Sequence, residues 1–391
     1  MTDKINTQLI IQVSILTLLI LNVSISFTAF DFLQGCSYLV WGLCCISFLG
    51  LSVLFIKKPY ITYLDACVLT YLIVIIVSTF INGTDLKTAL YRSIELILLM
   101  LIYNQWEKPN VVAKTFAIVL SLCAYLNLLI MIIFPDWMFA AKDTFDSHLL
   151  GGNYNQIGSR LIFALTLTIL CFRFSKWWIV NFIFLSITSI TILALVGSMT
   201  SLSCIILFLL FCLIPSVKIQ KICLICFFIF YLIFQFGVCF NGEGLHNNKM
   251  AVYIIEDVLG KDITFTNRTQ LWDAAGKKFV ESPILGYGFV DKEWYLANME
   301  SSAIGPHNFI YSILLNGGLT LIAILLLSIV VMFRRLMGHI DKTATIVLMG
   351  TCVFLFMSTM EVFPFFFFFG LIYTLYYYPF INFKSDEEQL S

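Results

Sequence analysis

Residues Ile11–Leu21 read IQVSILTLLIL, and residues Ile205–Leu213 read IILFLLFCL. These runs are continuously apolar, without the alternation over about ten residues that a membrane β-strand shows. The rest of the chain is similar: of its 391 residues, 60% are hydrophobic and 12% are charged, and the mean hydropathy is +0.95. A soluble domain carries about 25% charged residues. The sequence therefore predicts an all-α polytopic membrane protein whose helices satisfy their own backbone hydrogen bonds in lipid.

Apolar segments of span length predict about twelve transmembrane helices. They lie near residues 8–30, 36–56, 61–81, 88–103, 112–134, 157–173, 177–196, 200–216, 219–240, 307–333, 343–361 and 364–381. The stretch between the ninth and tenth segments is too polar and too long to be a simple turn. The predicted domains are residues 1–240 with nine helices, residues 241–306 as one large loop containing short helices, and residues 307–391 with three helices and a tail.

The distribution of Lys and Arg predicts the orientation of these helices. With the N-terminus placed in the cytoplasm, the inner segments hold 13 of the 23 Lys and Arg. The short outer loops near residues 31–35, 197–200 and 361–364 hold none. This pattern predicts both termini in the cytoplasm and the large loop on the outer, periplasmic face. The first apolar stretch is span-length and lacks a small-residue cleavage site, so no cleavable signal is expected.

Net charge and cysteine content limit which partners and cofactors we expect. The net charge is zero, so bulk charge indicates no nucleic-acid partner. Most of the 12 cysteines lie in apolar runs and none lies in the large loop, so no disulfide is expected there. Cys223 and Cys226 form a CxxC pair inside an apolar helix, where small apolar filler is a better interpretation than a metal or redox site. We expect no cofactor and no metal.

The large loop is predicted to contain a short helix that starts near Arg268. Residues 266–267 are Thr and Asn, either of which can cap a helix. The apolar stripe recurs at every fourth position, at Leu271, Ala275 and Phe279. Trp272 lies beside this stripe and Pro283 ends the helix. Such a helix can lie at the outer membrane surface with Trp272 at headgroup depth.

Two polar residues are expected where membrane helices meet the outer face. His307 follows Pro306 at the start of the tenth span, and imidazole suits general acid–base chemistry. A helix cap or a wetted surface residue is the commoner role of a lone histidine at such a place. Arg160 lies about one turn inside the sixth span, where it either snorkels to the interface or binds phosphate with its fork of donors. Because the cytoplasmic nucleotide pool is absent outside, a phosphate-bearing substrate there would be lipid-linked.

Several short motifs, taken together, resemble the O-antigen polymerase/ligase superfamily. They are Asn267-Arg268-x-x-x-Trp272, Ser282-Pro283-x-x-Gly286-Tyr287-Gly288, His307-Asn308, Asn316-Gly317-Gly318-Leu319, Gly152-Asn153-x-Asn155-Gln156-x-Gly158 and Gly197-Ser198-Met199-Thr200-Ser201. The motifs cover roughly residues 150–320, and the predicted topology covers the whole chain. No single motif is specific, and their order together with the spans and the loop carries the resemblance. The Gly-Tyr-Gly segment is expected to form a flexible turn.

The resemblance implies a metal-independent glycosyltransferase at the outer face of the bacterial cytoplasmic (inner) membrane. It would move a glycan from undecaprenyl diphosphate to a hydroxyl of another glycan. The resemblance implies that Arg268 binds the donor diphosphate and that His307 is the base on the acceptor hydroxyl. Positive charge favours a diphosphate leaving group, and an attacking hydroxyl needs a proton acceptor. Asn308, Tyr287 and Trp272 belong to the same motifs and are expected to contact substrate.

One position departs from the family pattern. Many relatives carry arginine after the Gly-Ser of the outer turn, where this chain has Met199. Arg160 is the candidate substitute, because it is expected at the same membrane depth. Arg92, near the outer end of the fourth span, is a weaker candidate for the same diphosphate contact.

Polymerase and ligase differ in their acceptor. We favour a polymerase that joins undecaprenyl-diphosphate-linked repeat units into O-antigen or a similar surface polysaccharide. The alternative is an O-antigen ligase that transfers the glycan to lipid A-core. The expected partners are a lipid-linked oligosaccharide and membrane lipid, and a chain-length regulator is a candidate protein partner.

Two further classes remain open from the sequence. A polysaccharide flippase or other transporter could use membrane charges as a pathway, namely Asp65, Arg92, Glu95, Arg160 and Glu361. The two halves of the chain show no internal repeat, although transporters commonly have one. A non-enzymatic scaffold is the last alternative.

Overall fold

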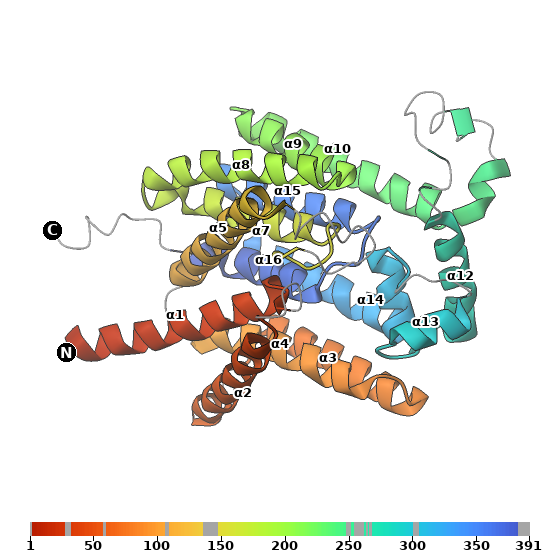
Figure 1. Ribbon diagram of the computed structural model, residues 1–391, viewed down its shortest axis with the longest axis horizontal. Helices are drawn as coiled ribbons and strands as arrows, with labels where there is room; N and C mark the ends of the chain where they lie inside the picture. The colour runs from red at the N-terminus through yellow and green to blue at the C-terminus, as the bar shows by residue number, and fades with distance from the viewer. Residues whose placement is uncertain are drawn as a thin grey trace.

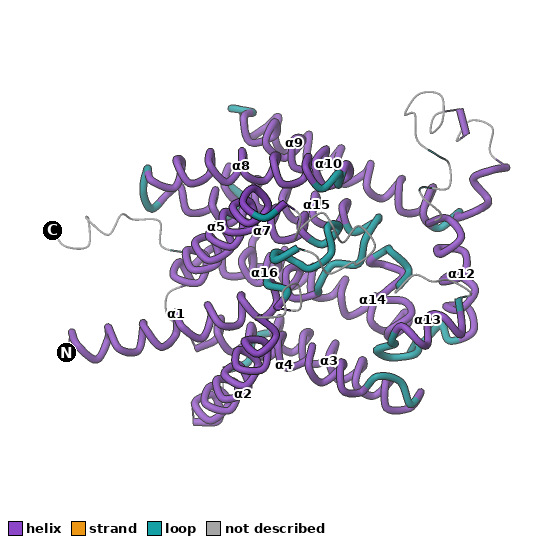
Figure 2. The backbone as a smooth tube through the Cα atoms, in the orientation of Figure 1, coloured by secondary structure: helices purple, strands orange, loops and turns teal. Residues whose placement is uncertain are grey.

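The computed structural model describes residues 2–27, 33–57, 60–105, 109–135, 148–247, 252–253, 262, 265, 268–299 and 305–381. These residues are mostly helical and form no strand, as Figure 2 shows. The α-helices are α1 (Thr2–Ser24), α2 (Gln34–Lys57), α3 (Tyr63–Asn82), α4 (Leu86–Gln105), α5 (Pro109–Ile133), α7 (Ile157–Leu170), α8 (Trp177–Leu195), α9 (Met199–Leu213), α10 (Val217–Phe234), α12 (Arg268–Glu281), α13 (Lys292–Asn298), α14 (Phe309–Leu336), α15 (Lys342–Met357) and α16 (Phe365–Tyr377). Short helical turns are η3 (Cys171–Arg173), η4 (Gln235–Cys239), η5 (Gly242–Asn247) and η7 (Tyr378–Phe380).

Each of the predicted spans coincides with a helix. Among the described residues, six helices are long and apolar enough to cross a membrane, namely α2, α3, α5, α8, α10 with η4, and α14. Four shorter apolar helices correspond to α1, α9, α15 and α16 with η7. The chain is therefore an all-α, multi-pass membrane protein. The full count of twelve crossings and the outer position of the loop stay predictions.

Helix α7 lies at the centre of the bundle. All 14 of its residues are buried, and α15, α5 and α8 pack around it. Phe163 packs edge-on against Phe116 and Phe367, with ring centroids 5.1 and 5.3 Å apart. On α15, a side chain at Gly350 would collide with Thr166 of α7, so this glycine permits the close approach. A helix that is apolar on every side belongs in such an interior.

Helix α14 is broken in its first half by two glycines. Gly317 has φ −158° and ψ 18°, and Gly318 has φ 62° and ψ −155°, a conformation that essentially only glycine adopts. The break frees backbone groups that would cost free energy if left unpaired in a membrane protein.

The segment after α12 satisfies these groups. The N–H groups of Tyr287 and Gly288 donate to the carbonyls of Leu315 (2.6 Å) and Asn316 (3.0 Å). In return, the N–H groups of Leu319 and Thr320 donate to Pro283 and Ile284, over 2.8 and 3.3 Å. A side chain at Gly288 would also collide with the backbone of Thr79 on α3. The expected flexible turn is thus wrong: this segment is docked into the helix break.

Helix α12 has the predicted extent but a different environment. It begins at Arg268 and ends at Glu281, two residues before Pro283; residues 266–267, the predicted cap, lie outside the described residues. Trp272 is fully buried within the protein. Its ring lies 6.0 Å from that of Phe265, in a small core where α12 packs against α14. The apolar face of α12 is thus covered by α14, and the position of the helix at the membrane surface stays a prediction.

Figure 1 shows how these parts are arranged. The first residues of α1 lie at one end of the molecule, and α12 and α13 lie at the other end. This arrangement is compatible with a cytoplasmic N-terminus and an outer loop, which remain predictions.

Candidate active site

Contacts from two other segments hold the start of α14. The Asn308 side-chain oxygen accepts a hydrogen bond from the Tyr311 N–H (3.1 Å) and caps the helix. Its side-chain amide donates to Gln235 Oε1 (3.1 Å) and to the Thr359 carbonyl (3.1 Å). The position of residue 307 is therefore fixed relative to the loop between α15 and α16.

His307 points its imidazole at a carboxylate of that loop. Its φ of 45° is unusual for a residue other than glycine and costs about 1 kcal/mol. Nδ1 of His307 lies 3.0 Å from Oε2 of Glu361, and the two side chains are 25% and 11% exposed. A carboxylate on Nδ1 fixes the ring and leaves Nε2 available to accept a proton. This pair is therefore a candidate acid–base unit.

A chain of polar contacts continues from Glu361 into α7. The Gln156 amide nitrogen lies 3.5 Å from Glu361 Oε1 and donates to the Val362 carbonyl over 2.8 Å. The Gln156 amide oxygen accepts from Arg160, 3.0 Å away. Arg160 thus reaches the His307–Glu361 pair through Gln156 without contacting it directly.

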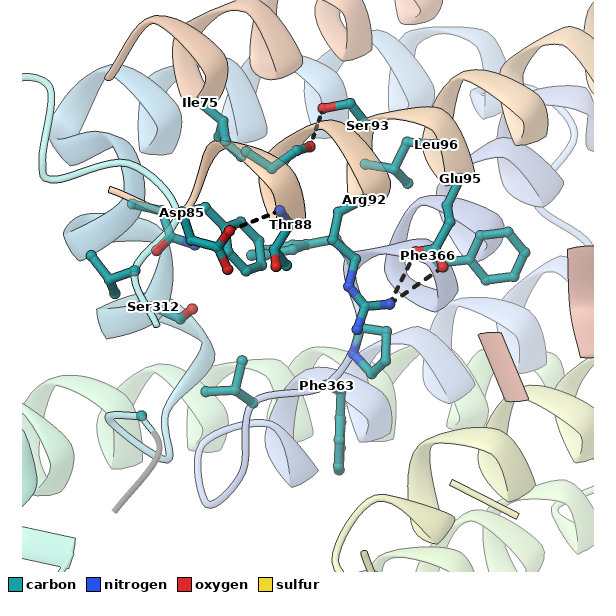
Figure 3. Close-up of a pocket in the computed structure, with 18 of the residues that line it drawn as sticks. Ile75, Asp85, Thr88, Arg92, Ser93, Glu95, Leu96, Ser312, Phe363 and Phe366 are labelled. Atoms are coloured by element: carbon teal, nitrogen blue, oxygen red, sulfur yellow. Dashed lines mark hydrogen bonds and ion pairs between the residues drawn. The ribbon is translucent and has the colours of Figure 1, made fainter. Parts of the chain in front are cut away.

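A cavity of about 580 Å³, here called the α4 cavity, opens beside α4 and α13 (Figure 3). Its charged lining residues balance in number: Arg92, Arg160 and Lys292 against Asp85, Glu95 and Asp291. Amide side chains and aromatic rings make up much of the remaining wall: Asn153, Gln156, Asn316, Tyr71, Phe289, Tyr295, Phe363, Phe365 and Phe366. A wall of paired charges, amides and rings suits a neutral polar ligand such as a saccharide.

Arg92 projects from α4 into the α4 cavity, where Figure 3 shows it between Glu95 and Phe363. Its guanidinium forms an ion pair with Glu95, at 3.1 Å, and the side chains are 46% and 2% exposed. Asn22 of α1 donates to the other Glu95 oxygen over 3.0 Å. The buried carboxylate is thus compensated from two sides, and Arg92 keeps part of its surface open to the cavity.

A second cavity of about 400 Å³, here called the α12 cavity, lies beside α12 and the outer turn before α9. Arg268 and Glu361 line it, together with the predicted outer turn that contains Met199. Much of its wall is apolar, for example Phe234, Phe265 and Phe356. The two cavities share Phe363.

His307 stands at the boundary between these cavities. Pro306, directly before it, lines the α4 cavity, and its partner Glu361 lines the α12 cavity. The structure therefore brings His307 close to both spaces, but it separates Arg268 from Arg160 and Arg92. Arg160 does not line the cavity at Met199, so it does not occupy the place of the missing arginine there.

Arg160 and Arg268 also differ in how many of their guanidinium donors are already bonded to the protein. Arg160 is 5% exposed and donates to the Gln156 carbonyl and side chain, Ser159 Oγ and the Val23 carbonyl, over 2.9 to 3.1 Å. Only its Nε is without a partner among the described residues. Arg268 has one long hydrogen bond in the described structure, from Nη1 to the Phe265 carbonyl at 3.4 Å. Of the five guanidinium N–H donors of Arg268, most have no partner among the described residues.

The other three predicted contact residues line neither cavity. Asn308 is fully buried as the helix cap, and Trp272 is fully buried against α14. The Tyr287 hydroxyl donates to the Lys278 carbonyl over 2.8 Å, and burial together with neighbouring Glu281 raises the pKa of Tyr287. These side chains support the segments that carry His307 and Arg268.

Two residues of the candidate site were not predicted for it. Glu361 was considered only as a transporter charge, and Gln156 only as part of a motif. Both stand near the outer ends of predicted spans, which is a signal that could have placed them at the same membrane depth as His307. Pairing Glu361 with His307 needed the fold, because 54 residues separate them.

The described residues contain no group of three or more His, Cys, Asp or Glu side chains that could hold a metal ion. Comparison with known families gives one finding: the model of the O-antigen ligase family matches residues 174–326. This match confirms the resemblance to the O-antigen polymerase/ligase superfamily over that part of the chain. No curated protein and no solved structure matched.

Proposed function

Because residues 174–326 carry a domain of the O-antigen ligase family, we propose that this membrane protein transfers a glycan from a polyprenyl diphosphate to a hydroxyl of another saccharide. The observation that supports this proposal is the contact between His307 and Glu361 at the boundary of two cavities. A base at that boundary can serve an acceptor on one side while the donor lies on the other.

The α12 cavity is the proposed donor site. Arg268 offers unused guanidinium donors, which suit the oxygens of a diphosphate. The aromatic wall formed by Phe234, Phe265 and Phe356 suits the apolar chain of a polyprenyl carrier. Leaving-group charge would develop next to the guanidinium, where it is stabilised most.

The α4 cavity is the proposed acceptor site. Its charges balance and its amides and rings match the hydroxyls and apolar faces of sugars. Arg92 can donate to the sugar from its exposed side while it stays paired with Glu95. Arg160 acts here chiefly as a positioning residue, because it holds Gln156, which contacts the loop of Glu361.

The reaction follows from this placement. His307 Nε2 takes the proton of the acceptor hydroxyl as its oxygen attacks the anomeric carbon of the donor sugar. The bond from that carbon to the diphosphate oxygen breaks, and the electron pair leaves with the diphosphate at Arg268. Glu361 stabilises the imidazolium that forms. No step requires a metal ion, so we propose that the reaction is metal-independent.

A polymerase is the first candidate, with a second lipid-linked repeat unit as acceptor and undecaprenyl diphosphate as carrier. The site would face the periplasm from the inner membrane, with both termini in the cytoplasm. The three-part division at residues 241 and 306 and a chain-length regulator as partner belong to the same proposal. The second candidate is an O-antigen ligase with lipid A-core as acceptor. The description of the matching family supports this candidate.

Purified protein in liposomes tests the proposal directly. Lipid-linked oligosaccharide alone, without nucleotide, should yield a ladder of longer lipid-linked glycans if the protein is a polymerase. Product that forms only after lipid A-core is added would identify a ligase. Movement of the oligosaccharide across the bilayer without any new glycosidic bond would overturn the proposal in favour of a transporter.

A further inference from the structure

A separate groove of about 620 Å³ lies between α3 and α14 and shares no lining residue with either cavity. Its α3 side is one helical face, formed by Tyr63, Ala66, Cys67 and Thr70, which follow the i, i+3, i+4, i+7 spacing. Its α14 side includes Ile324, Leu327 and Val331. Small residues on one helix opposite larger ones on the other leave this space open.

The walls of the α3–α14 groove are effectively apolar. The Thr70 hydroxyl donates to the Ala66 carbonyl of its own helix over 2.8 Å, so it presents little polarity to the groove. Leu327 and Tyr63 are 53% and 82% exposed. The groove is therefore accessible from the lipid side and offers contacts to a hydrocarbon chain.

One end of the groove is cationic. Arg334 and Arg335 line it, and no carboxylate among the described residues does. The Arg335 guanidinium lies 4.5 Å from the ring centroid of Tyr376 and 4.4 Å from that of Phe380, and it donates to the Tyr376 hydroxyl over 3.0 Å. Its buried Nε has no partner among the described residues. The rings thus orient the guanidinium while leaving donors for an anion.

The dimensions match one leaflet of a bilayer. Ile324 to Arg335 spans about 16 Å at 1.5 Å per helical residue, which is close to half of a hydrocarbon core of about 30 Å. Arg335 follows Phe309, the first residue of α14, by 26 residues, which would be about 39 Å in an unbroken helix. If His307 faces the periplasm, the arginines lie among headgroups of the cytoplasmic leaflet, which carries anionic lipid.

We propose that the α3–α14 groove binds an anionic phospholipid of the leaflet opposite the active site. One acyl chain lies along Ala66, Thr70 and Leu327, and the phosphate is held by Arg334 and Arg335. The site needs both the apolar α3–α14 groove and its two arginines. A neutral lipid lacks the net negative charge that the arginines bind, and free phosphate lacks the acyl chain that the groove binds. This site is independent of the proposed glycosyl transfer.

Thermal unfolding of the full chain in nanodiscs tests this site. We expect the midpoint to be about 3 °C higher in an equal mixture of phosphatidylglycerol and phosphatidylcholine than in phosphatidylcholine alone. The double variant R334Q/R335Q should lose this lipid-dependent shift. Ala66→Phe, which fills the exposed furrow and keeps both arginines, should lose it too, provided that its midpoint in phosphatidylcholine equals the wild-type value.

Lys221→Gln is the matched control, since Lys221 is an exposed cation on α10 and lies outside the groove. It should keep the full shift. Native mass spectrometry should show one retained phosphatidylglycerol on the wild type and on Lys221→Gln, and none on the double variant. Equal midpoints in both lipids, a full shift in Ala66→Phe, or the same shift from inorganic phosphate in phosphatidylcholine would each overturn the proposal.

Discussion

The α4 cavity and the α12 cavity share Phe363 but differ in how their arginines are used. In the α4 cavity, Arg92 is paired with Glu95 and Arg160 donates to four protein acceptors. In the α12 cavity, Arg268 has one long hydrogen bond. Cations that are already paired with protein groups suit a site for a neutral ligand, whereas a cation with unused donors attracts an anion. The contrast supports the proposal that the donor diphosphate binds on one side of His307 and the acceptor saccharide on the other.

The largest effect should come from the residue that serves both cavities. His307→Ala removes the proton acceptor, so we expect glycosyl transfer to fall about 10³-fold, measured as the initial rate in liposomes. His339→Ala is the matched control, because His339 is exposed and lines neither cavity, and it should leave the rate unchanged. Near-normal transfer in His307→Ala would remove histidine from the mechanism.

The second effect distinguishes the donor side. Arg268→Ala should lower the rate about 10²-fold, because the diphosphate loses its cation as it leaves. Lys277→Ala, which removes an exposed cation from the same helix, should have little effect. A full rate in Arg268→Ala would mean that the donor diphosphate lies elsewhere.

The third effect tests the pair at the boundary. Glu361→Gln keeps the shape of the side chain but loses the negative charge beside Nδ1 of His307. Carboxylates that orient metal-ligating histidines typically contribute about 10- to 100-fold, and by analogy we expect about a 30-fold decrease in kcat. KM for both substrates should stay unchanged. A rise in KM alone would show that Glu361 contacts substrate instead of positioning the base.

A smaller effect belongs to the acceptor side. Arg160→Lys keeps the charge but cannot hold Gln156, Ser159 and the Val23 carbonyl together. We expect about a tenfold loss in kcat/KM with varied acceptor and no change in the affinity for the donor. Full activity would indicate that Arg160 only fills space in the bundle.

The smallest effect is expected from metal removal. The donor side relies on a guanidinium for leaving-group charge, so EDTA should leave the rate unchanged within about twofold in the liposome assay. A large loss that magnesium or calcium restores would add a metal to the donor side and contradict this part of the proposal.

Much of the fold was predictable because helix placement depends on local apolar runs. The sequence located a helix at every predicted span and the limits of α12. The burial of Trp272 was not predicted, because the packing of α12 depends on α14, which comes 28 residues after α12 ends at Glu281. The docking of the Gly-Tyr-Gly segment was missed for the same reason, since its partners are the carbonyls freed at Gly317 and Gly318.

The candidate site was only partly predictable. Motif order identified His307 and Arg268, and helix position identified Arg160 and Arg92. The sequence could not show that Arg160 donates its hydrogen bonds to the protein itself, because Val23 and Gln156 come from different segments. It also could not show that two cavities, rather than one, surround the histidine.

Binding of undecaprenyl diphosphate to the protein in nanodiscs tests the assignment of the two cavities most directly. The dissociation constant is measured for the wild type and for the Arg268→Ala and Arg160→Lys variants. The account predicts that Arg268→Ala weakens binding at least about tenfold, or roughly 1.4 kcal/mol, and that Arg160→Lys binds like wild type. Normal binding by Arg268→Ala together with weakened binding by Arg160→Lys would contradict it and place the diphosphate in the α4 cavity.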